Sequence, residues 1–378
     1  MILSESIHFS ENLIRLRRQK KITQEELASF LGVTKASVSK WETGQSLPDI
    51  LLLPQLASFF DVTLDELLGF KPQLSKEQIR KIYHELASDF AKQPFRQIMD
   101  KSRSLVKKYY ACYPFLFQMA VLWLNHFMLA QGPQMQQQIL QETAGLCAHI
   151  ISDCDDIGIC NDAILLKSTV DLQLGKAQEV IDALEELLNP LRLAGQSDGV
   201  LIRAYLLSGK THQAASRAQI SMYMHLLSLV ASALEYLSIK SADLAACEET
   251  IRRITALIDT FQIEHLHPNT ASSFYYQTAV IYSMHGLEER ALFYLAKYEE
   301  NIRYLLAESN IALHGDAYFD LLDEWITQLD LGPAPPRDKK MVADSSLQLL
   351  DHPSFSILQG NLTFKQIKNN LTKEVEKQ

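Results

Sequence analysis

Hydrophobic positions in this chain recur at intervals of three and four residues, which is the period of an α-helix. Strand-like alternation of apolar and polar residues is rare between residues 95 and 331, where short stretches of Gly, Pro, Asn and Asp interrupt the helical pattern. This patterning predicts an all-α protein. The length of 378 residues is sufficient for two or more domains.

A short helix is predicted to begin at Thr23. Thr23 and Glu26 have the spacing of a capping box, in which each side chain bonds a backbone N–H of the first helical turn. Gly32 is expected to end this helix, because the left-handed conformation of a helix end is costly for a residue with a Cβ atom.

A second short helix follows, capped by Thr34. Val38 and Trp41 lie three residues apart and are expected to point inward. The opposite face is small, polar and cationic, which suits entry into the major groove of DNA. The residues on that outward face are Lys35, Ala36, Ser39 and Lys40.

Residues 12–68 resemble the Cro-like, xenobiotic-response-element type of helix-turn-helix regulators. The resemblance rests on the segments NLIRLRRQKKI, TQEELA, GVTKASVSKWETG, PDILLLPQLASFFDV and TLDELLG. It implies a five-helix, lambda-repressor-like domain that binds double-stranded DNA, with an internal ion pair between Arg17 and Glu42. It also implies base reading by Lys35, Ala36, Ser39 and Lys40, and phosphate contacts by Gln24, Thr34, Ser37, Thr43 and Gln45.

The net charge of −9 is distributed unevenly along the chain. Residues 1–110 contain 17 Lys and Arg against 13 Asp and Glu, a net charge of +4, whereas residues 111–378 carry −13. Within residues 71–110, ten basic residues accompany four acidic ones. This basic segment either lies near DNA or forms a solvated helical face, and the sequence leaves both interpretations open.

Several functional classes find no support in the sequence. No leader peptide and no apolar stretch of about 20 residues is evident, so we expect a cytoplasmic protein without a membrane span. Five cysteines without a CxxC pair fit a reducing compartment. His265 and His267 lack the spacing of zinc ligands and are interpreted as a loop. We therefore expect no catalytic residues, no metal, no cofactor and no enzyme activity.

Four segments are expected along the chain. The DNA-binding domain occupies residues 1–70 and ends where GFKPQLS interrupts the helical pattern. A linker helix in residues 71–94 carries an apolar stripe that packs against either the C-terminal domain or a second subunit. Helical repeats occupy residues 95–331. A Pro-rich connector and a flexible tail form residues 332–378, although apolar residues in this tail favour a part that caps the last repeat.

The repeats resemble a tetratricopeptide-like α-solenoid. The segment ASSFYYQTAVIYSMHGLEERALFYLAKYEEN matches the offsets of one helical hairpin, with Gly286 at its turn. Gly175 and Gly209 occupy similar turns and lie 34 residues apart, which is the length of one such repeat. Weak matches elsewhere indicate a degenerate solenoid with longer helices inserted.

Tetratricopeptide solenoids commonly receive a peptide or protein on their concave surface. Together with a Cro-like head, this architecture resembles Gram-positive regulators that sense peptides. We expect a dimeric transcription regulator whose repeat domain senses a peptide or small molecule. The alternative is a DNA-tethered scaffold whose repeat domain binds a protein partner. Candidate residues of the effector pocket are Asn125, Arg203, Tyr205, Tyr275, Tyr276, Asn301 and Arg303.

Overall fold

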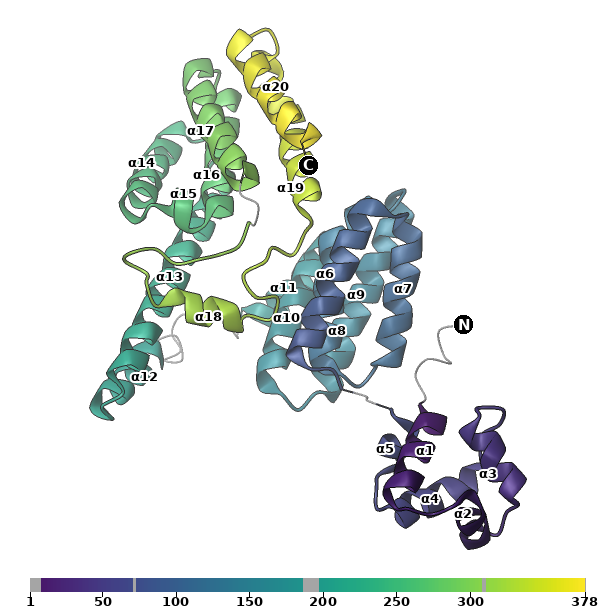
Figure 1. Cartoon of the computed structure of the whole chain (residues 1–378). Helices are drawn as coiled ribbons and strands as arrows, with labels where there is room; N and C mark the ends of the chain where they lie inside the picture. The colour runs from purple at the N-terminus through teal and green to yellow at the C-terminus, as the bar shows by residue number, and fades with distance from the viewer. Residues whose placement is uncertain (1–7, 71–72, 186–196, 308–310, 378) are drawn as a thin grey trace. The chain divides into compact units, whose positions relative to one another are not determined.

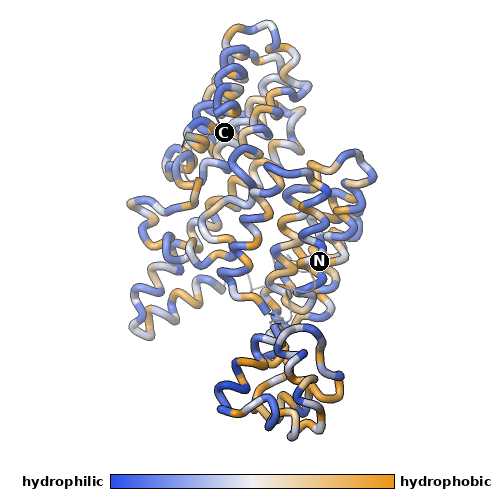
Figure 2. The backbone as a smooth tube through the Cα atoms, turned by 45° about the vertical axis from the view of Figure 1, so that its right-hand side comes forward, coloured by the Kyte–Doolittle hydropathy of each residue, from blue (hydrophilic) through white to orange (hydrophobic). Residues whose placement is uncertain are grey.

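The computed structural model describes residues 8–70, 73–185, 197–307 and 311–377. Across these ranges the chain forms helices and no strand, so the all-α fold class is confirmed (Figure 1). Hydrophobic and hydrophilic residues are interleaved along the helices, as Figure 2 shows. Lys71 and Pro72, on which part of the predicted domain boundary depends, lie outside the described residues.

The chain divides into two compact units. The first comprises residues 1–75 with 105–115, and the second comprises residues 76–104 with 116–378. The helices of the first unit between Phe9 and Leu68 are α1 (Phe9–Gln19), α2 (Gln24–Leu31), α3 (Lys35–Glu42), the 3-10 helix η2 (Ile50–Leu52), α4 (Leu53–Phe60) and α5 (Leu64–Leu68).

One hydrophobic core holds these five α-helices together. Each helix contributes at least one side chain that is shielded from solvent, because its apolar residues recur on a single face. This packing accounts for the five-helix domain that the family resemblance implies. The side chains with 0% exposure are Leu13, Leu27, Val38, Leu56 and Leu67.

The predicted helix boundaries around the central turn are confirmed. Thr23 and Glu26 form the capping box at the start of α2, with the Thr23 N–H donating to Glu26 Oε2 at 2.7 Å. Gly32 ends α2 with φ of +67°, in the left-handed region. Thr34 Oγ1 then accepts the Ser37 N–H at the start of α3. Local sequence therefore determines where the two helices begin and end.

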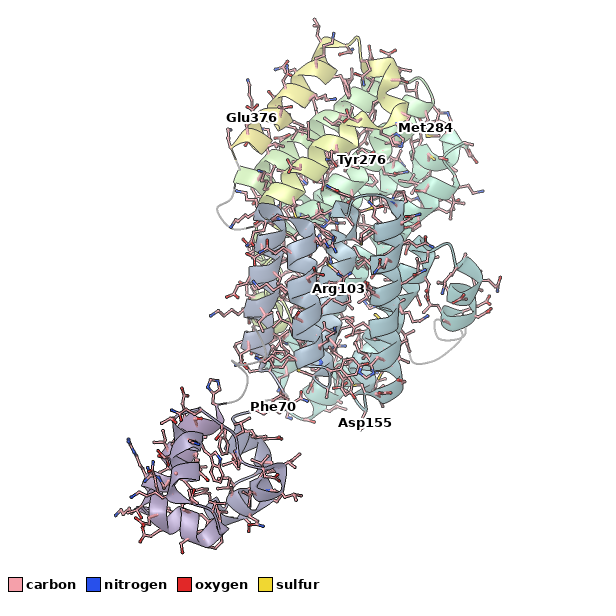
Figure 3. The ribbon with its side chains drawn as sticks, turned by 90° about the vertical axis from the view of Figure 1, so that its right-hand side faces the viewer. Phe70, Arg103, Asp155, Tyr276, Met284 and Glu376 are labelled. Atoms are coloured by element: carbon pink, nitrogen blue, oxygen red, sulfur yellow. The ribbon has the colours of Figure 1, made fainter. Side chains whose placement is uncertain are left out.

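The second unit begins with a group of long helices. In this group Arg103 on α7 bonds Glu142 on α9 through two N–H donors, at 2.8 and 3.1 Å (Figure 3 labels Arg103). The helices are α6 (Lys76–Lys92), α7 (Phe95–Lys108), α8 (Tyr113–His126), the 3-10 helix η3 (Phe127–Leu129), α9 (Pro133–Asp153), α10 (Ile157–Gln173) and α11 (Ala177–Leu184). The end of α7 and the start of α8 fall within residues 105–115 and so belong to the first unit.

Helix α6 belongs to the second unit and is not a separate linker helix. Its apolar stripe is buried within the same chain, so burying it does not require the second subunit that the sequence left open as a partner. The sequence showed the stripe but not the helices that cover it: Phe90 lies against Phe95 and is stacked on His126, with ring centroids 5.4 and 4.6 Å away. The buried residues of α6 include Ile79, Tyr83, Leu86 and Phe90.

Three pairs of consecutive helices form hairpins with a glycine at the turn. Gly175 separates α10 from α11, Gly209 separates α12 from α13, and Gly286 separates α16 from α17, with φ values of +76°, +74° and +72°. The three predicted turns are thus confirmed. The helices in this region are α12 (Ser197–Leu207), α13 (Thr211–Ile239), α14 (Leu244–Phe261), α15 (Ile263–Leu266), α16 (Pro268–Met284), α17 (Glu288–Ala307) and α18 (Leu322–Gln328).

The C-terminal segment is folded and not flexible, and it packs on the last hairpin as its apolar residues indicated. Phe355, Phe364 and Leu371 are buried in the same core as the α16–α17 hairpin, and α20 packs against α17 (Figure 1). Burying these side chains offsets the entropy cost of ordering the segment. Its elements are α19 (Lys339–Gln348), the 3-10 helices η5 (Leu349–Asp351) and η6 (Pro353–Leu358), and α20 (Leu362–Glu376).

Helix α13 is long and apolar enough, by length and composition alone, to cross a membrane. We expected no such segment. Arg217 and Glu235 are the charged residues among its 29, and the polar residues between them are uncharged. One side of α13 is buried in the core of the second unit, through Tyr223, Val230 and Leu237. Of the most apolar 18-residue stretch of this helix, 28% is buried.

The glycine turns lead to a stability prediction. Gly286→Ala should destabilise the second unit by about 1–2 kcal/mol, because an alanine at φ of +72° brings its Cβ close to the following carbonyl oxygen. In calorimetry this loss would lower the melting temperature of that unit by a few degrees.

Gly199→Ala is the matched control. Gly199 lies within α12 and an added Cβ meets no atom within 4 Å, so alanine should leave stability unchanged or raise it by up to about 1 kcal/mol. Equal melting temperatures for the two variants would contradict the conformational argument.

Candidate nucleic-acid interface

Helix α3 presents one face to solvent and the other to the domain core. Val38 and Trp41 are 0% and 4% exposed, and they anchor the helix. The four predicted base-reading residues lie on the opposite side, where Lys35, Ala36 and Lys40 are exposed and Ser39 is half-buried. The structure therefore brings these four side chains together on one helical surface.

Both ends of α3 carry polar groups predicted to contact phosphates. At its start the hydroxyls of Thr34 and Ser37 lie 2.9 Å apart. At its end the Thr43 hydroxyl lies within hydrogen-bonding distance of two carbonyl oxygens of the last turn, at 3.0 and 3.2 Å, and Gln45 is exposed. A phosphate oxygen needs a donor, so the Thr43 hydroxyl would have to release its carbonyl partners to bind one. Of the Thr34 and Ser37 hydroxyls, one donates to the other and the second keeps its O–H for a phosphate.

Gln24 is held differently from the other predicted phosphate contacts. Its side-chain amide Nε2 donates to Glu42 Oε2 at 2.8 Å, so one of its donors is used within the domain. The amide nitrogen has a second N–H. A phosphate contact by Gln24 would therefore have to use that donor or the backbone N–H at the start of α2.

An ion pair links α1 to α3. Arg17 Nε lies 2.5 Å from Glu42 Oε1, and a second guanidinium nitrogen lies 3.0 Å from Glu42 Oε2. A further N–H of Arg17 donates to the Ile22 carbonyl at 2.8 Å. The two side chains are 14% and 6% exposed. Arg17 is therefore a scaffold residue, as the sequence indicated.

The environment of Glu42 favours its charged form. Burial acts to raise the pKa of Glu42, but hydrogen bonds from Arg17 and Gln24 and the positive charge of Arg17 outweigh it, so the pKa lies below its usual value of 4.5. The hydrogen bond to Glu42 is the main cause of the raised pKa of Arg17. The acidic residue of α3 is thus neutralised inside the domain, away from the exposed lysines.

Lys35 makes one ion pair on the surface. Its Nζ lies 3.3 Å from Glu25 Oε2, and both side chains are largely exposed. Exposed pairs of this kind contribute little to stability, about 0–1 kcal/mol. Lys35 can therefore exchange this partner for a DNA group at small cost.

The seven residues predicted for an effector pocket do not gather around one cavity. Tyr275 is fully buried and donates to Glu264. Asn301 is buried and donates to the Pro268 carbonyl and to the Ser272 hydroxyl. Arg203 and Tyr205 lie on α12, Tyr276 packs against aromatic residues of the core, and Arg303 pairs with Glu299. Asn125 lines the cavity described next.

The second unit contains a cavity of about 590 Å³. Its walls come from segments widely separated in sequence, so helical periodicity could not bring them together. Two motifs were visible, HLHP at 265–268 and GPAPPR at 332–337, but they were interpreted as a loop and a connector. The lining includes His265, His267, Asn269, Tyr304, His314, Pro333, Arg337, Ser345 and Leu349.

Comparison with known proteins places the first unit among helix-turn-helix domains. The helix-turn-helix family model HTH_3 matches residues 13–67. The activator BcrR of Enterococcus faecalis is 37% identical over 84 residues, covering 21% of this chain and 41% of BcrR. The uncharacterised regulator YqaE of Bacillus subtilis is 43% identical over 60 residues, covering 16% and 52%. The prophage-derived uncharacterised regulator YonR of Bacillus subtilis is 35% identical over 72 residues, covering 19% and 67%.

The chain spans about half the length of the curated relatives it matches. Among solved structures, the apo form of the competence regulator ComR from Streptococcus vestibularis aligns over 85% of this chain and 97% of its own. The two are 12% identical, with a TM-score of 0.24. A similarity this low supports no conclusion about the second unit.

The five packed helices and the exposed cationic face of α3 define a helix-turn-helix domain of the Cro-like type. The relatives that share this domain are transcriptional regulators. The chain belongs to the family of HTH-type transcriptional regulators.

The ion pair gives a prediction for stability and its pH dependence. Glu42→Gln should lower the protection of α1–α3 amides from hydrogen exchange by about 10- to 100-fold at pH 7, because it leaves the half-buried Arg17 without its counter-charge. A lowered pKa means that the Glu42 contribution is present above pH 4.5 and is lost as pH falls through the folded-state value. The difference between wild type and variant should therefore shrink below pH 4.5.

Glu25→Gln serves as the control. It makes the same chemical change at a residue whose side chain is 76% exposed, so protection should change by no more than a few-fold. The interpretation of Glu42 fails if the two variants lose equal protection, or if the effect of Glu42→Gln is independent of pH.

Proposed function

We propose that the protein is a sequence-specific transcription regulator that binds double-stranded DNA as a homodimer and responds to a peptide or small-molecule effector. The observation that carries this proposal is the outward face of α3. Two exposed lysines flank small residues there, while Glu42, the acidic residue of the helix, is turned inward to Arg17. An anionic groove would encounter positive and small side chains.

The proposed contacts divide by type. Lys35 and Lys40 can donate to guanine O6 and N7, Ser39 can donate or accept, and Ala36 can contact a thymine methyl group. The groups at the helix ends position α3 through phosphates and carry no sequence information directly. These proposed phosphate contacts are Gln24, Thr34, Ser37, Thr43 and Gln45.

Homodimerisation follows from the small size of the reading surface. One recognition helix makes few base contacts, and specific affinities of about 10⁻⁸ M or better usually require a second half-site. Two copies of α3 would then occupy successive major grooves about 34 Å apart. We place this activity in the cytoplasm, with no membrane attachment and no catalytic role.

Effector sensing is assigned to the second unit. Its first helix, α6, begins at Lys76, directly after the residues of the first unit. An effector can change DNA binding only if it has different affinities for two arrangements of the protein. As the helix of the second unit that is nearest in sequence to the DNA-binding unit, α6 is our candidate for transmitting such a difference.

Lys40→Ala should weaken operator binding by about 1–3 kcal/mol, which is roughly 5- to 150-fold, and should relax the preference at one base position. Operator fragments would first be selected from genomic DNA, beginning with the protein's own promoter. Their affinities would then be measured by gel retardation across a salt series, because phosphate contacts make affinity fall with salt.

Lys365→Ala is the matched control, since Lys365 is an exposed lysine on α20 and lies outside the basic segment 71–110. It removes the same charge outside the proposed interface and should change affinity less than Lys40→Ala. Equal losses in the two variants would remove Lys40 from the set of base-reading residues. Absence of selective binding by the folded dimer, with cell extract added, would instead favour the scaffold alternative.

A further inference from the structure

The cavity in the second unit is lined, in the part of the chain that the structure describes, by one positively charged residue and no acidic one. The chain carries a net charge of −9, yet none of the described residues lining the cavity is Asp or Glu. Its polar lining is instead rich in hydrogen-bond donors. These residues include Arg337, His265, His267, His314, Asn125 and Asn269.

Arg337 supplies the permanent positive charge of this cavity. The residue is exposed, and its Nε lies 3.4 Å from Asn125 Oδ1, which is a long hydrogen bond. A guanidinium has five N–H donors in a planar fork that matches a carboxylate. Arg337 and Asn125 together therefore present donors to an anionic group.

His267 adds an oriented donor. Its Nδ1 accepts the backbone N–H of Thr270 at 3.3 Å, which caps the start of α16. Burial lowers the pKa of His267 and keeps the ring neutral near pH 7. The Thr270 hydroxyl also lies 2.8 Å from Nδ1. With Nδ1 accepting from Thr270, the ring proton is assigned to Nε2, and His267 lines the cavity.

Apart from Tyr304, Ser345 and Ser346, the remainder of the wall is apolar. Side chains of leucine, isoleucine and proline from several segments complete a space of about 590 Å³, which lies within the usual range for small-molecule sites. Such a space suits an apolar body of fatty-acid or short-peptide size. The apolar lining includes Leu266, Leu305, Ile311, Pro333, Pro335 and Leu349.

We propose that this cavity binds an amphipathic carboxylate, with the anionic group of the ligand on Arg337 and its apolar body against the leucine and proline walls. The ligand class includes free aliphatic acids and short apolar peptides with a free C-terminus. As the effector site, this cavity deepens the proposed regulatory function and rests on it. Binding of the carboxylate depends only on the cavity and does not require the regulatory function.

The cavity wall is joined directly to α6. One guanidinium nitrogen of Arg80 donates to the carbonyls of Thr327 and Leu329, at 3.1 and 2.6 Å, and Nε donates to the Asp330 carbonyl at 3.1 Å. The Tyr83 hydroxyl donates to the Pro336 carbonyl at 3.1 Å. Since Pro333 to Arg337 line the cavity, one continuous segment contacts both the ligand space and α6.

A ligand that prefers one position of this segment would bias the position of α6 by the same free energy. The bonds are made to backbone carbonyls, so they restrain the path of the segment itself. Differential contact with residues 333–337 is therefore sufficient to connect cavity occupancy to the first helix after the DNA-binding unit.

Calorimetric titration without DNA tests the site. The probes are octanoate against octanamide, and the tripeptide Leu-Phe-Leu with a free carboxylate against its C-terminal amide. At least one of the two acids should bind wild type at least 10-fold more tightly than its amide, because a charge-assisted hydrogen bond is lost in the amide. The acid that binds identifies the source of the ligand.

Arg337→Gln should weaken binding of that acid by about 10- to 100-fold and should bring acid and amide to similar affinity. Arg303→Gln is the control, because Arg303 is an exposed arginine of α17 that does not line the cavity. Ala312→Phe, which fills the space and keeps Arg337, should abolish binding of acid and amide alike. Circular dichroism would verify that each variant is folded.

The cavity proposal is overturned if both acids fail to bind wild type at millimolar concentration, or if acid and amide bind equally. It is also overturned if Arg303→Gln weakens binding as much as Arg337→Gln does. The effector role is tested separately by adding the bound acid to the gel-retardation assay. Unchanged operator affinity would refute that role and leave the binding site in place, whereas absence of any operator complex would refute the proposed function alone.

Discussion

The position of α3 depends on how Glu42 is held. Its carboxylate accepts hydrogen bonds from Arg17 on α1 and from Gln24 on α2, so one acidic side chain joins three helices. Trp41, the preceding residue, is buried in the core. The outward residues of α3 therefore project from a fixed support, which a reading surface requires because misplaced donors lose base-specific hydrogen bonds.

Sequence patterns identified the features of the fold that depend on short-range geometry. The Thr23 and Glu26 capping box, the left-handed Gly32 and the turns at Gly175, Gly209 and Gly286 all follow from backbone chemistry within a few residues. The assignment of α6 and of the C-terminal segment failed for the opposite reason. Their apolar faces are covered by other helices, such as α8 with His126 over Phe90 of α6 and α17 over α20, and periodicity shows an apolar face without showing what covers it.

The same distinction applies to the two candidate sites. The outward face of α3 could be predicted because the inward positions of Val38 and Trp41 determine what remains exposed. The cavity could not, since Asn125 and Arg337 lie 212 residues apart in sequence. Tyr275 and Asn301 were chosen for chemistry that suits a ligand, but their polar atoms are occupied by Glu264 and by the backbone at Pro268. Residue type alone did not distinguish binding from packing.

The bonds between Arg80 and the carbonyls near residue 330 also have a consequence during protein synthesis. They span about 250 residues, so α6 leaves the ribosome long before its partners exist. At about 5–20 residues per second, that interval lasts roughly 12–50 seconds. The helix-turn-helix core, by contrast, is complete once Leu67 has emerged. We expect the nascent chain to carry a folded DNA-binding head for most of its translation, while the Arg80 guanidinium of α6 lacks its carbonyl partners until synthesis is nearly finished.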